Sequence, residues 1–417
     1  MRRLFSPSRP PAFAELVILL AALMSLMAFS IDSIMPALPD IAAEFVPDEV
    51  SRAQLVISAF VLGTGFGQLF IGPFSDSYGR RAALSLGVGL FVLGAIAGIV
   101  ANSLEALLAA RFLQGLGAAA GRVVSQSVTR DLFSGRAQAR VGSLIFTFFV
   151  IVPAIAPLIG QQIIALAGWH GLFGAYVALG LTVLTWFLLR QPETLADEHR
   201  RVFRPGRIWE AVAEVLRSAV AMRYLVVMTL GFGQLMAYIS SAQEVYVEAL
   251  GAGDRFALYF AGVALVSGTS GVINARLVMR LGMRPLASAA FGSQLLIAGA
   301  VWALWAAGVF DGLSQHTQLW IFIAWSVTLF FMNGLTFGNV TALAMEPLGH
   351  IAGTASAVIG AFSSILAVAI AVPVGLAFDG SPKPLMLGVA ICSAVAFALV
   401  WTDRGRDRAQ DSTYRDR

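Results

Sequence analysis

The chain consists of long apolar runs separated by short polar segments. Runs of about 20 mostly hydrophobic residues recur along the whole sequence, and a helix of that length crosses the ~30 Å hydrocarbon core of a bilayer. A secretory signal peptide would account for only one of them. The runs are continuous and do not alternate at period two, which excludes a transmembrane barrel. The pattern therefore predicts an all-α membrane protein.

Twelve transmembrane helices are expected. Their approximate ranges are 13–35, 52–74, 82–101, 105–127, 140–164, 170–190, 222–244, 256–275, 284–308, 318–342, 352–377 and 383–402. The long connection between the sixth and seventh spans predicts four parts of the chain. These are an N-terminal six-helix bundle at 1–190, a cytoplasmic linker with an amphipathic segment at 191–221, a C-terminal six-helix bundle at 222–402 and a cytoplasmic tail at 403–417.

The two halves repeat each other in sequence. Tyr78-Gly79-Arg80-Arg81 follows the second span, and Leu281-Gly282-Met283-Arg284 follows the eighth. Many transporters are built by such duplication, with the substrate site at mid-membrane where the halves meet. We therefore expect two six-helix bundles around a central cavity.

Composition and charge support this reading. Hydrophobic residues make up 58% of the chain and charged residues only 12%, whereas soluble proteins carry about 25%. Arginines gather near both termini and in alternate loops, and the opposite loops carry acids such as Glu44, Glu105, Glu244 and Glu248. The positive-inside rule then places both termini in the cytoplasm. The bases are scattered over loops, so the net charge of +4 does not indicate a nucleic-acid partner.

No residue pattern indicates a cofactor or an enzyme. The single Cys392 and the four histidines lie far apart in sequence, with no spacing typical of a metal site. The only lysine, Lys383, falls in a short outer loop and belongs to no phosphate-binding glycine loop. No clustered nucleophile and base is visible. We expect no metal, no cofactor and no use of ATP.

Asp32 is the most informative polar residue of the apolar runs. It lies near the end of the first span. Inserting an ionised carboxylate costs about 2.5–3.5 kcal/mol at the centre of a membrane helix, and such a residue by default marks an ion or substrate path. Its surroundings tune its proton affinity, so we expect a proton-coupling role. Alternatively, Asp32 stays hydrated near the interface and only shapes the helix end before Pro36.

The segment Gly72-Pro73-Phe74-Ser75-Asp76-Ser77-Tyr78-Gly79-Arg80-Arg81 resembles the glycine, aspartate, glycine, arginine signature of the major facilitator superfamily. The resemblance implies a conformational-switch loop made of Gly72, Asp76, Gly79, Arg80, Arg81 and Asp131. In that reading, Asp76, Arg80 and Asp131 form a charge network that stabilises the outward-facing state. Ser77 replaces the family's usual arginine. The alternative is a basic loop that only sets topology.

Arg111 in the fourth span resembles the family's fourth-helix arginine, which is linked to proton coupling. A nearby cation changes the proton affinity of a carboxylate, so one hypothesis is that Arg111 acts on Asp32 directly or through water. The alternative is a structural role, with hydrogen bonds to backbone carbonyls.

The fifth span contains Pro153, Pro157 and Gly160. It resembles the antiporter motif that the superfamily's exporters carry in their fifth helix, although Val152 and Ala154 replace the usual glycines. Prolines four apart remove hydrogen bonds and bend the helix. An ordinary kinked span is the alternative.

Further segments resemble the Bcr/CflA branch of drug:proton antiporters. They are Pro36-Ala37-Leu38-Pro39-Asp40-Ile41, Gln68, Arg130-Asp131 and Glu193-Thr194-Leu195. Polar or aromatic residues on predicted helices are candidates for the substrate cavity: Gln54, Ser58, Gln126, Tyr238, Gln243, Asn333, Asn339 and Phe362.

The expected function is proton-coupled export of small, mostly apolar or amphipathic drugs across the bacterial inner membrane, by a monomer embedded in the lipid bilayer. The main alternative is an exporter or symporter of the same fold for a specific metabolite, such as an amino acid or sugar derivative. A membrane enzyme or a sensor is a further alternative from a different class.

Overall fold

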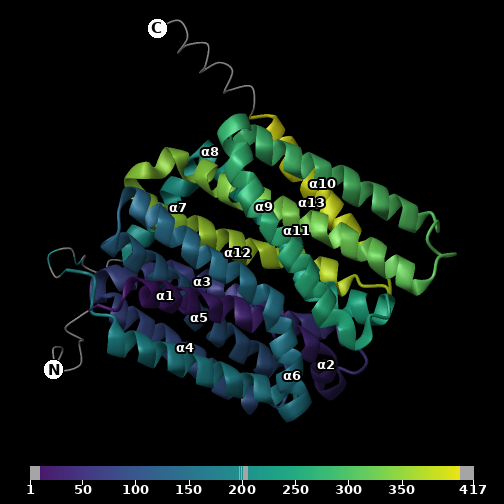
Figure 1. The fold of residues 1–417 in the computed structure, drawn as a ribbon, viewed down its shortest axis with the longest axis horizontal. Helices are drawn as coiled ribbons and strands as arrows, with labels where there is room; N and C mark the ends of the chain where they lie inside the picture. The colour runs from purple at the N-terminus through teal and green to yellow at the C-terminus, as the bar shows by residue number, and fades with distance from the viewer. Residues whose placement is uncertain (1–9, 197, 199, 201–204, 404–417) are drawn as a thin grey trace, which may run out of the picture. The chain divides into compact units, whose positions relative to one another are not determined.

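The computed structural model describes residues 10–196, 198, 200 and 205–403, and this part of the chain contains helices but no strand (Figure 1). The helices before the linker are α1 (Phe13–Asp32), α2 (Leu38–Phe45), α3 (Leu55–Tyr78), α4 (Arg80–Ile99), α5 (Leu104–Leu132) and α6 (Gly135–Arg190). Those that follow are α7 (Pro205–Arg217), α8 (Ala219–Glu244), α9 (Phe256–Leu281), α10 (Met283–Ala306), α11 (Gln315–Met345), α12 (Ala352–Leu376) and α13 (Lys383–Trp401).

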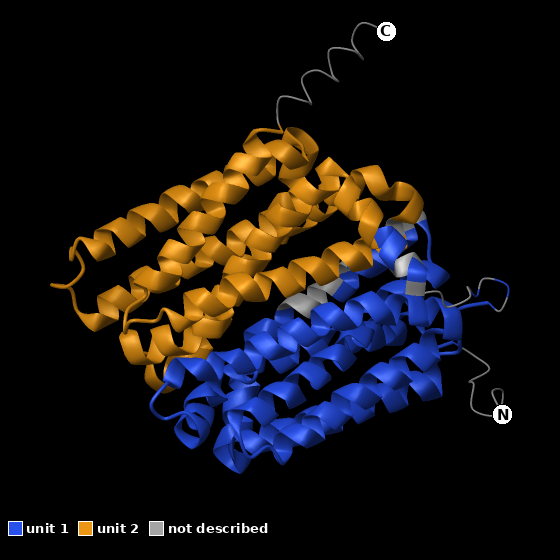
Figure 2. Cartoon of the chain, turned by 180° about the vertical axis from the view of Figure 1, so that it is seen from behind, with its two compact units in different colours: residues 1–211 blue, residues 212–417 orange. Residues whose placement is uncertain are grey.

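The chain forms two compact units, Met1–Ala211 and Val212–Arg417 (Figure 2). In the first unit, α5 packs against both α3 and α4, and α1 packs against α6. In the second unit, α8 packs against α12, and α10 packs against α13. The boundary between the units falls within α7, the amphipathic segment expected in the linker. Of the predicted tail, only Asp403 belongs to the described residues.

Helix α6 contains two membrane spans. Its 56 residues would measure about 84 Å as one straight helix, but Gly168 interrupts it with a non-helical φ of 66° and ψ of 179°. Both ends of α6 contact the start of α1: the Arg140 guanidinium lies 5.8 Å from the centre of the Phe13 ring, and Arg190 donates to Glu15 at 2.6 Å. The chain therefore runs out along α1 and returns, as expected for the fifth and sixth spans.

Eleven helical segments among the described residues are long and apolar enough to cross a membrane. One of them, Ile151–Arg190, contains the interruption at Gly168. The two parts of α6 on either side of Gly168 lie where the fifth and sixth spans, 140–164 and 170–190, were predicted.

Several predicted boundaries were wrong. Helix α3 continues to Tyr78, so Gly72 lies inside it and the expected loop shrinks to Gly79 alone. Glu44 lies in α2, although it was expected in an outer loop. Glu244 was grouped with the outer-loop acids, but it is the last residue of α8, where the predicted span 222–244 also ends. A helix satisfies its own backbone hydrogen bonds, so it can continue past the end of an apolar run.

Candidate functional site

Asp32 is the last residue of α1, and its side chain is only 3% exposed. Pro36 follows in a short 3₁₀ turn, Met35–Ala37. A continuing α-helix would need the N–H of residue 36 for the carbonyl of residue 32, and proline has none. No hydrogen bond or ion pair joins the Asp32 carboxylate to any other described residue. Helix α1 therefore ends at a buried carboxylate.

Arg111 on α5 is fully buried and anchors three helices. Its Nε donates to the carbonyl of Val56 at 3.2 Å, and one Nη donates to the carbonyl of Ser30 at 2.9 Å. The other Nη donates to Oε1 of Gln114 at 2.7 Å. The structure does not bring Arg111 into contact with Asp32, but it fixes the backbone two residues before that carboxylate.

Tyr176 connects the surroundings of Asp32 with Arg111. It lies on the returning half of α6, fully buried, with its hydroxyl 2.8 Å from the hydroxyl of Ser33. Its ring centre lies 5.9 Å from the Arg111 guanidinium. Sequence reasoning missed this residue. The available signal was that Tyr176 is the only tyrosine in the predicted span 170–190.

The predicted antiporter helix approaches α1 beside Asp32. Pro153, Pro157 and Gly160 all lie in the first half of α6. A Cβ atom on Gly160 would lie 2.1 Å from the carbonyl oxygen of Ser33, a separation that no side chain tolerates. Gly160 therefore lets the α6 backbone touch α1 one residue after the carboxylate.

This contact gives a testable prediction for Gly160→Ala. The added methyl must push α6 away from α1, and we expect a loss of about 1–3 kcal/mol in stability, as for other overpacked sites, together with slower transport. Gly174→Ala is the matched control on the same element, because no described atom lies within 4 Å of its Cβ position. Thermal unfolding of both purified variants measures the difference, and equal stabilities would contradict the close contact.

At the other end of the first unit, the structure brings together three residues of the predicted switch loop. Arg80 is 3% exposed and donates from Nη1 to Asp76 at 2.6 Å and to the hydroxyl of Ser75 at 2.9 Å. Its Nε and Nη2 donate to the two carboxylate oxygens of Asp131 at 2.8 and 3.2 Å. The planar guanidinium matches this two-oxygen geometry. Arg80 thus joins the end of α3, the start of α4 and the end of α5.

Glu193 closes this network, and sequence reasoning did not predict that role. Its carboxylate accepts the backbone N–H of Arg80 at 2.8 Å and that of Arg81 at 3.1 Å. These are unpaired donors at the start of α4, where a negative charge is favourable. Gly79 has a φ of 98°, and a Cβ there would lie 2.5 Å from the Glu193 carboxylate. Arg81 also donates to the carbonyl of Gln191 at 2.5 Å.

The second unit also has a glycine with positive φ before its third span and an acid that binds there, but this acid binds side chains, whereas Glu193 binds backbone N–H groups. Gly282 has a φ of 81° and a ψ of 163°, close to the 98° and 163° of Gly79. Asp403, just after α13, accepts hydrogen bonds from Arg223 and Tyr224, each at 2.7 Å, and from Arg284 at 3.1 Å. In each unit, an acid after the last span therefore binds the start of the third span.

Asp403 predicts a pH dependence of stability. Burial favours its neutral form, but the hydrogen bond from Tyr224 and the charges of Arg223 and Arg284 prevail and hold the pKa of Asp403 below its usual value. Because the folded-state pKa is the lower one, its stabilisation is complete at neutral pH and is lost as the pH falls below about 4.

Asp403→Asn should therefore destabilise the protein by about 2 kcal/mol at pH 7, with a smaller difference from the wild type near pH 3. Thermal unfolding in detergent at both pH values measures this. Asp379→Asn, in an exposed loop, is the control. A difference that stays constant with pH would contradict the assigned ionisation.

The predicted cavity residues differ in burial and in hydrogen-bond partners. Tyr238 is fully buried, and its hydroxyl lies 3.0 Å from that of Tyr246 within an aromatic cluster. Asn339 donates to the side chain of Asn274 at 2.8 Å. Gln126 is exposed and Phe362 is half-buried. The remaining candidates, Gln54, Ser58, Gln243 and Asn333, are buried.

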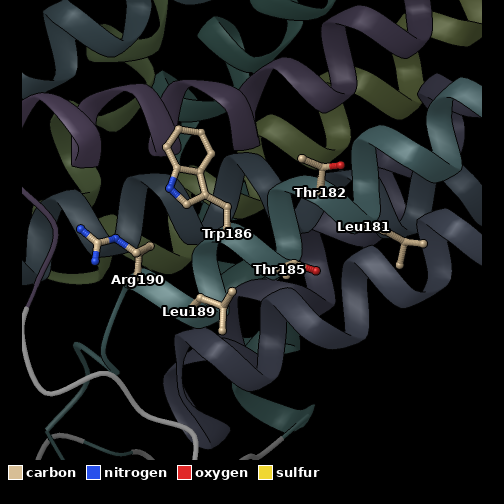
Figure 3. Close-up of a pocket in the computed structure, with 6 residues that line it drawn as sticks. All are labelled: Leu181, Thr182, Thr185, Trp186, Leu189 and Arg190. Carbon is tan, nitrogen blue, oxygen red and sulfur yellow. The ribbon is translucent and has the colours of Figure 1, made fainter.

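A surface groove of about 550 Å³ lies elsewhere, on the returning half of α6 (Figure 3). It is lined by Leu181, Thr182, Thr185, Trp186, Leu189 and Arg190. Trp186 and Arg190 both donate to Glu15 of α1. None of the predicted site residues lines this groove. Among the described residues, no group of histidine, cysteine, aspartate or glutamate side chains is arranged to hold a metal ion.

The fold, the signature segment and the buried charges can now be compared with known proteins. The sequence profile described as Major Facilitator Superfamily matches residues 18–372. The chain belongs to this superfamily. It is therefore a multi-pass membrane transporter for small molecules and not an enzyme, and the resemblance of the segment Gly72–Arg81 is confirmed.

The chain is also similar to individual members of the superfamily. The chain is 31% identical to an uncharacterized MFS-type transporter, YdgK, of Bacillus subtilis, over 87% of this chain and 88% of that protein. It is 30% identical to a bicyclomycin resistance protein homolog of Haemophilus influenzae, over 82% and 84%. It is 29% identical to the multidrug resistance protein MdtL of Vibrio parahaemolyticus, over 81% and 83%.

Solved structures show the same fold. A D-xylose-proton symporter matches with a TM-score of 0.72 at 15% identity, covering 94% of this chain and 98% of that one. The human organic anion transporter MFSD10 matches with a TM-score of 0.60 at 17% identity, covering 94% of this chain and all of the other. Both identities are low, so these likenesses concern the fold alone.

Proposed function

We propose that this superfamily member is a proton-coupled antiporter that exports small, mostly apolar or amphipathic drugs across the bacterial inner membrane. One observation carries the proposal: Asp32 is a carboxylate 3% exposed in a membrane-spanning segment, with no ionic partner among the described residues. Such a group marks an ion path by default. The names of the relatives, bicyclomycin resistance and multidrug resistance, support drugs as the substrate class.

In the proposed cycle, Asp32 takes a proton from the outer side, substrate binding or cavity closure changes its surroundings, and the proton leaves to the cytoplasm. Each charge moved inward releases about 2.3 kcal/mol per 100 mV of membrane potential. Arg111 holds the carbonyl of Ser30 and Gly160 touches Ser33, on either side of Asp32. Movement of α5 or α6 would therefore move the carboxylate.

We also propose that the network of Asp76, Arg80 and Asp131 stabilises the outward-facing state. Breaking it would release α3, α4 and α5 from one another at the end of the first unit. The positive-inside rule supports placing this network and both termini in the cytoplasm. The bundles at 1–190 and 222–402 would alternate in giving the substrate access to either side of the membrane, in a monomer.

The test is substrate-driven proton release from the purified protein in weakly buffered detergent, over a panel of antibiotics that includes bicyclomycin and chloramphenicol. At least one drug should release protons, because drug and proton compete in an exchange cycle. If no drug does so and a defined metabolite shows counterflow in proteoliposomes, the metabolite transporter replaces the drug exporter.

A further inference from the structure

The second unit buries a carboxylate of its own inside the membrane. Glu244 was expected in an outer loop, but it is the last residue of α8 and is 3% exposed. The apolar segment that contains it runs on to Ala249. Every residue of the stretch 236–246 is buried. An ionisable side chain in such a place is by default functional.

Glu244 resembles Asp32 in its place at the end of a helix. Each is the last residue of the first long helix in its half of the chain, and each is followed by irregular backbone. After Asp32 comes a 3₁₀ turn, Met35–Ala37, and after Glu244 comes a π-helical turn, Val245–Ala249. Such π-turns are rare and occur frequently at functional sites. Each half of the chain thus buries a carboxylate at the end of its first long helix.

The immediate neighbours are alike as well. Buried serines lie beside both acids: Ser30 and Ser33 near Asp32, and Ser240 and Ser241 near Glu244. In a helix, residues three and four before Glu244 lie on its own face. Serine hydroxyl groups on this face can donate a hydrogen bond to a carboxylate or accept one from a protonated carboxyl group.

The elements packed on α8 carry the other titratable groups of this region. They are α11, α12, α13, the turn Glu346–Ile351 and the π-helical turn itself. Their titratable side chains are His316, Glu346, His350, Lys383, Cys392, Tyr246 and Glu248. Helix α8 itself carries Arg223 and Tyr224 near its start and Tyr238 near its end. His316 and Lys383 stand at the first turns of α11 and α13, and Glu346 follows the far end of α11. The hydroxyls of Tyr238 and Tyr246 face each other.

We propose that Glu244 is a second proton-binding carboxylate of the transport cycle, so that each half of the chain carries one proton. The inference rests on the proposed exchange of drug for protons and adds its stoichiometry. The step is a protonation: the carboxylate takes a proton from water on one side of the membrane and returns it to water on the other.

The test is pH-difference infrared spectroscopy of the full-length protein in lipid nanodiscs, which detects the C=O stretch of protonated carboxyl groups without any substrate. Glu244→Gln should lose one pH-dependent band that Asp32→Asn retains. Glu248→Gln, one turn further on and exposed, is the matched control and should keep both bands. A Glu244→Gln spectrum identical to that of the wild type would overturn the proposal.

Two further measurements keep the interpretation separate from folding and from the proposed function. Glu244→Asp should keep a protonated band at a shifted frequency, and its loss in a folded protein would count against the proposal. Drug-driven proton release should fall by half in Glu244→Gln, because the Asp32 proton is still exchanged. Asp32→Asn should lose all release, because in the proposed cycle the drug acts on the surroundings of Asp32 and no exchange starts without that carboxylate. Absence of any release from the wild type would refute the drug exchange itself, while the infrared bands still decide the role of Glu244.

Discussion

Asp32→Asn should abolish drug-driven proton release while leaving the protein folded. The amide has nearly the shape of the carboxylate but cannot take up a proton. Because no described group pairs with the Asp32 side chain, the substitution breaks no ion pair and removes the cost of burying a charge. We therefore expect thermal stability equal to or above that of the wild type, together with complete loss of coupling.

Asp40→Asn is the control for this prediction. Asp40 lies eight residues further on, in α2, and is exposed, so its substitution should change neither release nor stability. Proton release by Asp32→Asn at the wild-type level would remove Asp32 from the coupling role. A marked loss of stability would instead indicate that Asp32 is a structural residue.

Arg80→Ala should give the second large effect. The substitution leaves Asp76 and Asp131 facing each other without the cation that both bind. Removing one partner of a buried ion pair costs about 3–5 kcal/mol, and we expect the lower figure because Asp76 is 33% exposed. About 3 kcal/mol changes a ratio of two conformations more than a hundredfold. Transport should therefore become very slow.

The matched control is Arg52→Ala, whose ion pairs with Glu49 and Glu105 are exposed and worth about 0–1 kcal/mol. Arg80→Lys tests geometry, because lysine keeps the charge but cannot bind both carboxylates in the same way. Transport rates in proteoliposomes and thermal unfolding give the comparison. Wild-type transport by Arg80→Ala would rule out a switch function for the network.

The sequence predicted those features that depend on local pattern. Apolar runs gave the spans, and the signature segment placed Asp76 and Arg80 in one short connection between the second and third spans. Asp131 was found only through the family resemblance. The structure adds the geometry, with both oxygens of Asp131 bound by one guanidinium.

Contacts between distant segments were missed, for physical reasons. Glu193 caps α4 from 113 residues away, and Asp403 binds Arg223 across 180 residues. Nothing in hydropathy predicts such partners, because a capping acid and a solvated acid look alike in sequence. Glu244 was grouped with the outer-loop acids because it ends the predicted span 222–244, and a span edge does not show whether an acid is solvated or buried. Its burial became visible only when the neighbouring helices were in place.

The most direct measurement of the central claim is drug movement in proteoliposomes under an imposed pH gradient. With the interior more acidic than the bath, an exchanger should accumulate bicyclomycin or another drug that releases protons, because protons leave as drug enters. Reversing the gradient should stop accumulation, and Asp32→Asn should show none under either condition. Accumulation only when protons flow inward with the drug would show a symporter and contradict the proposed antiport.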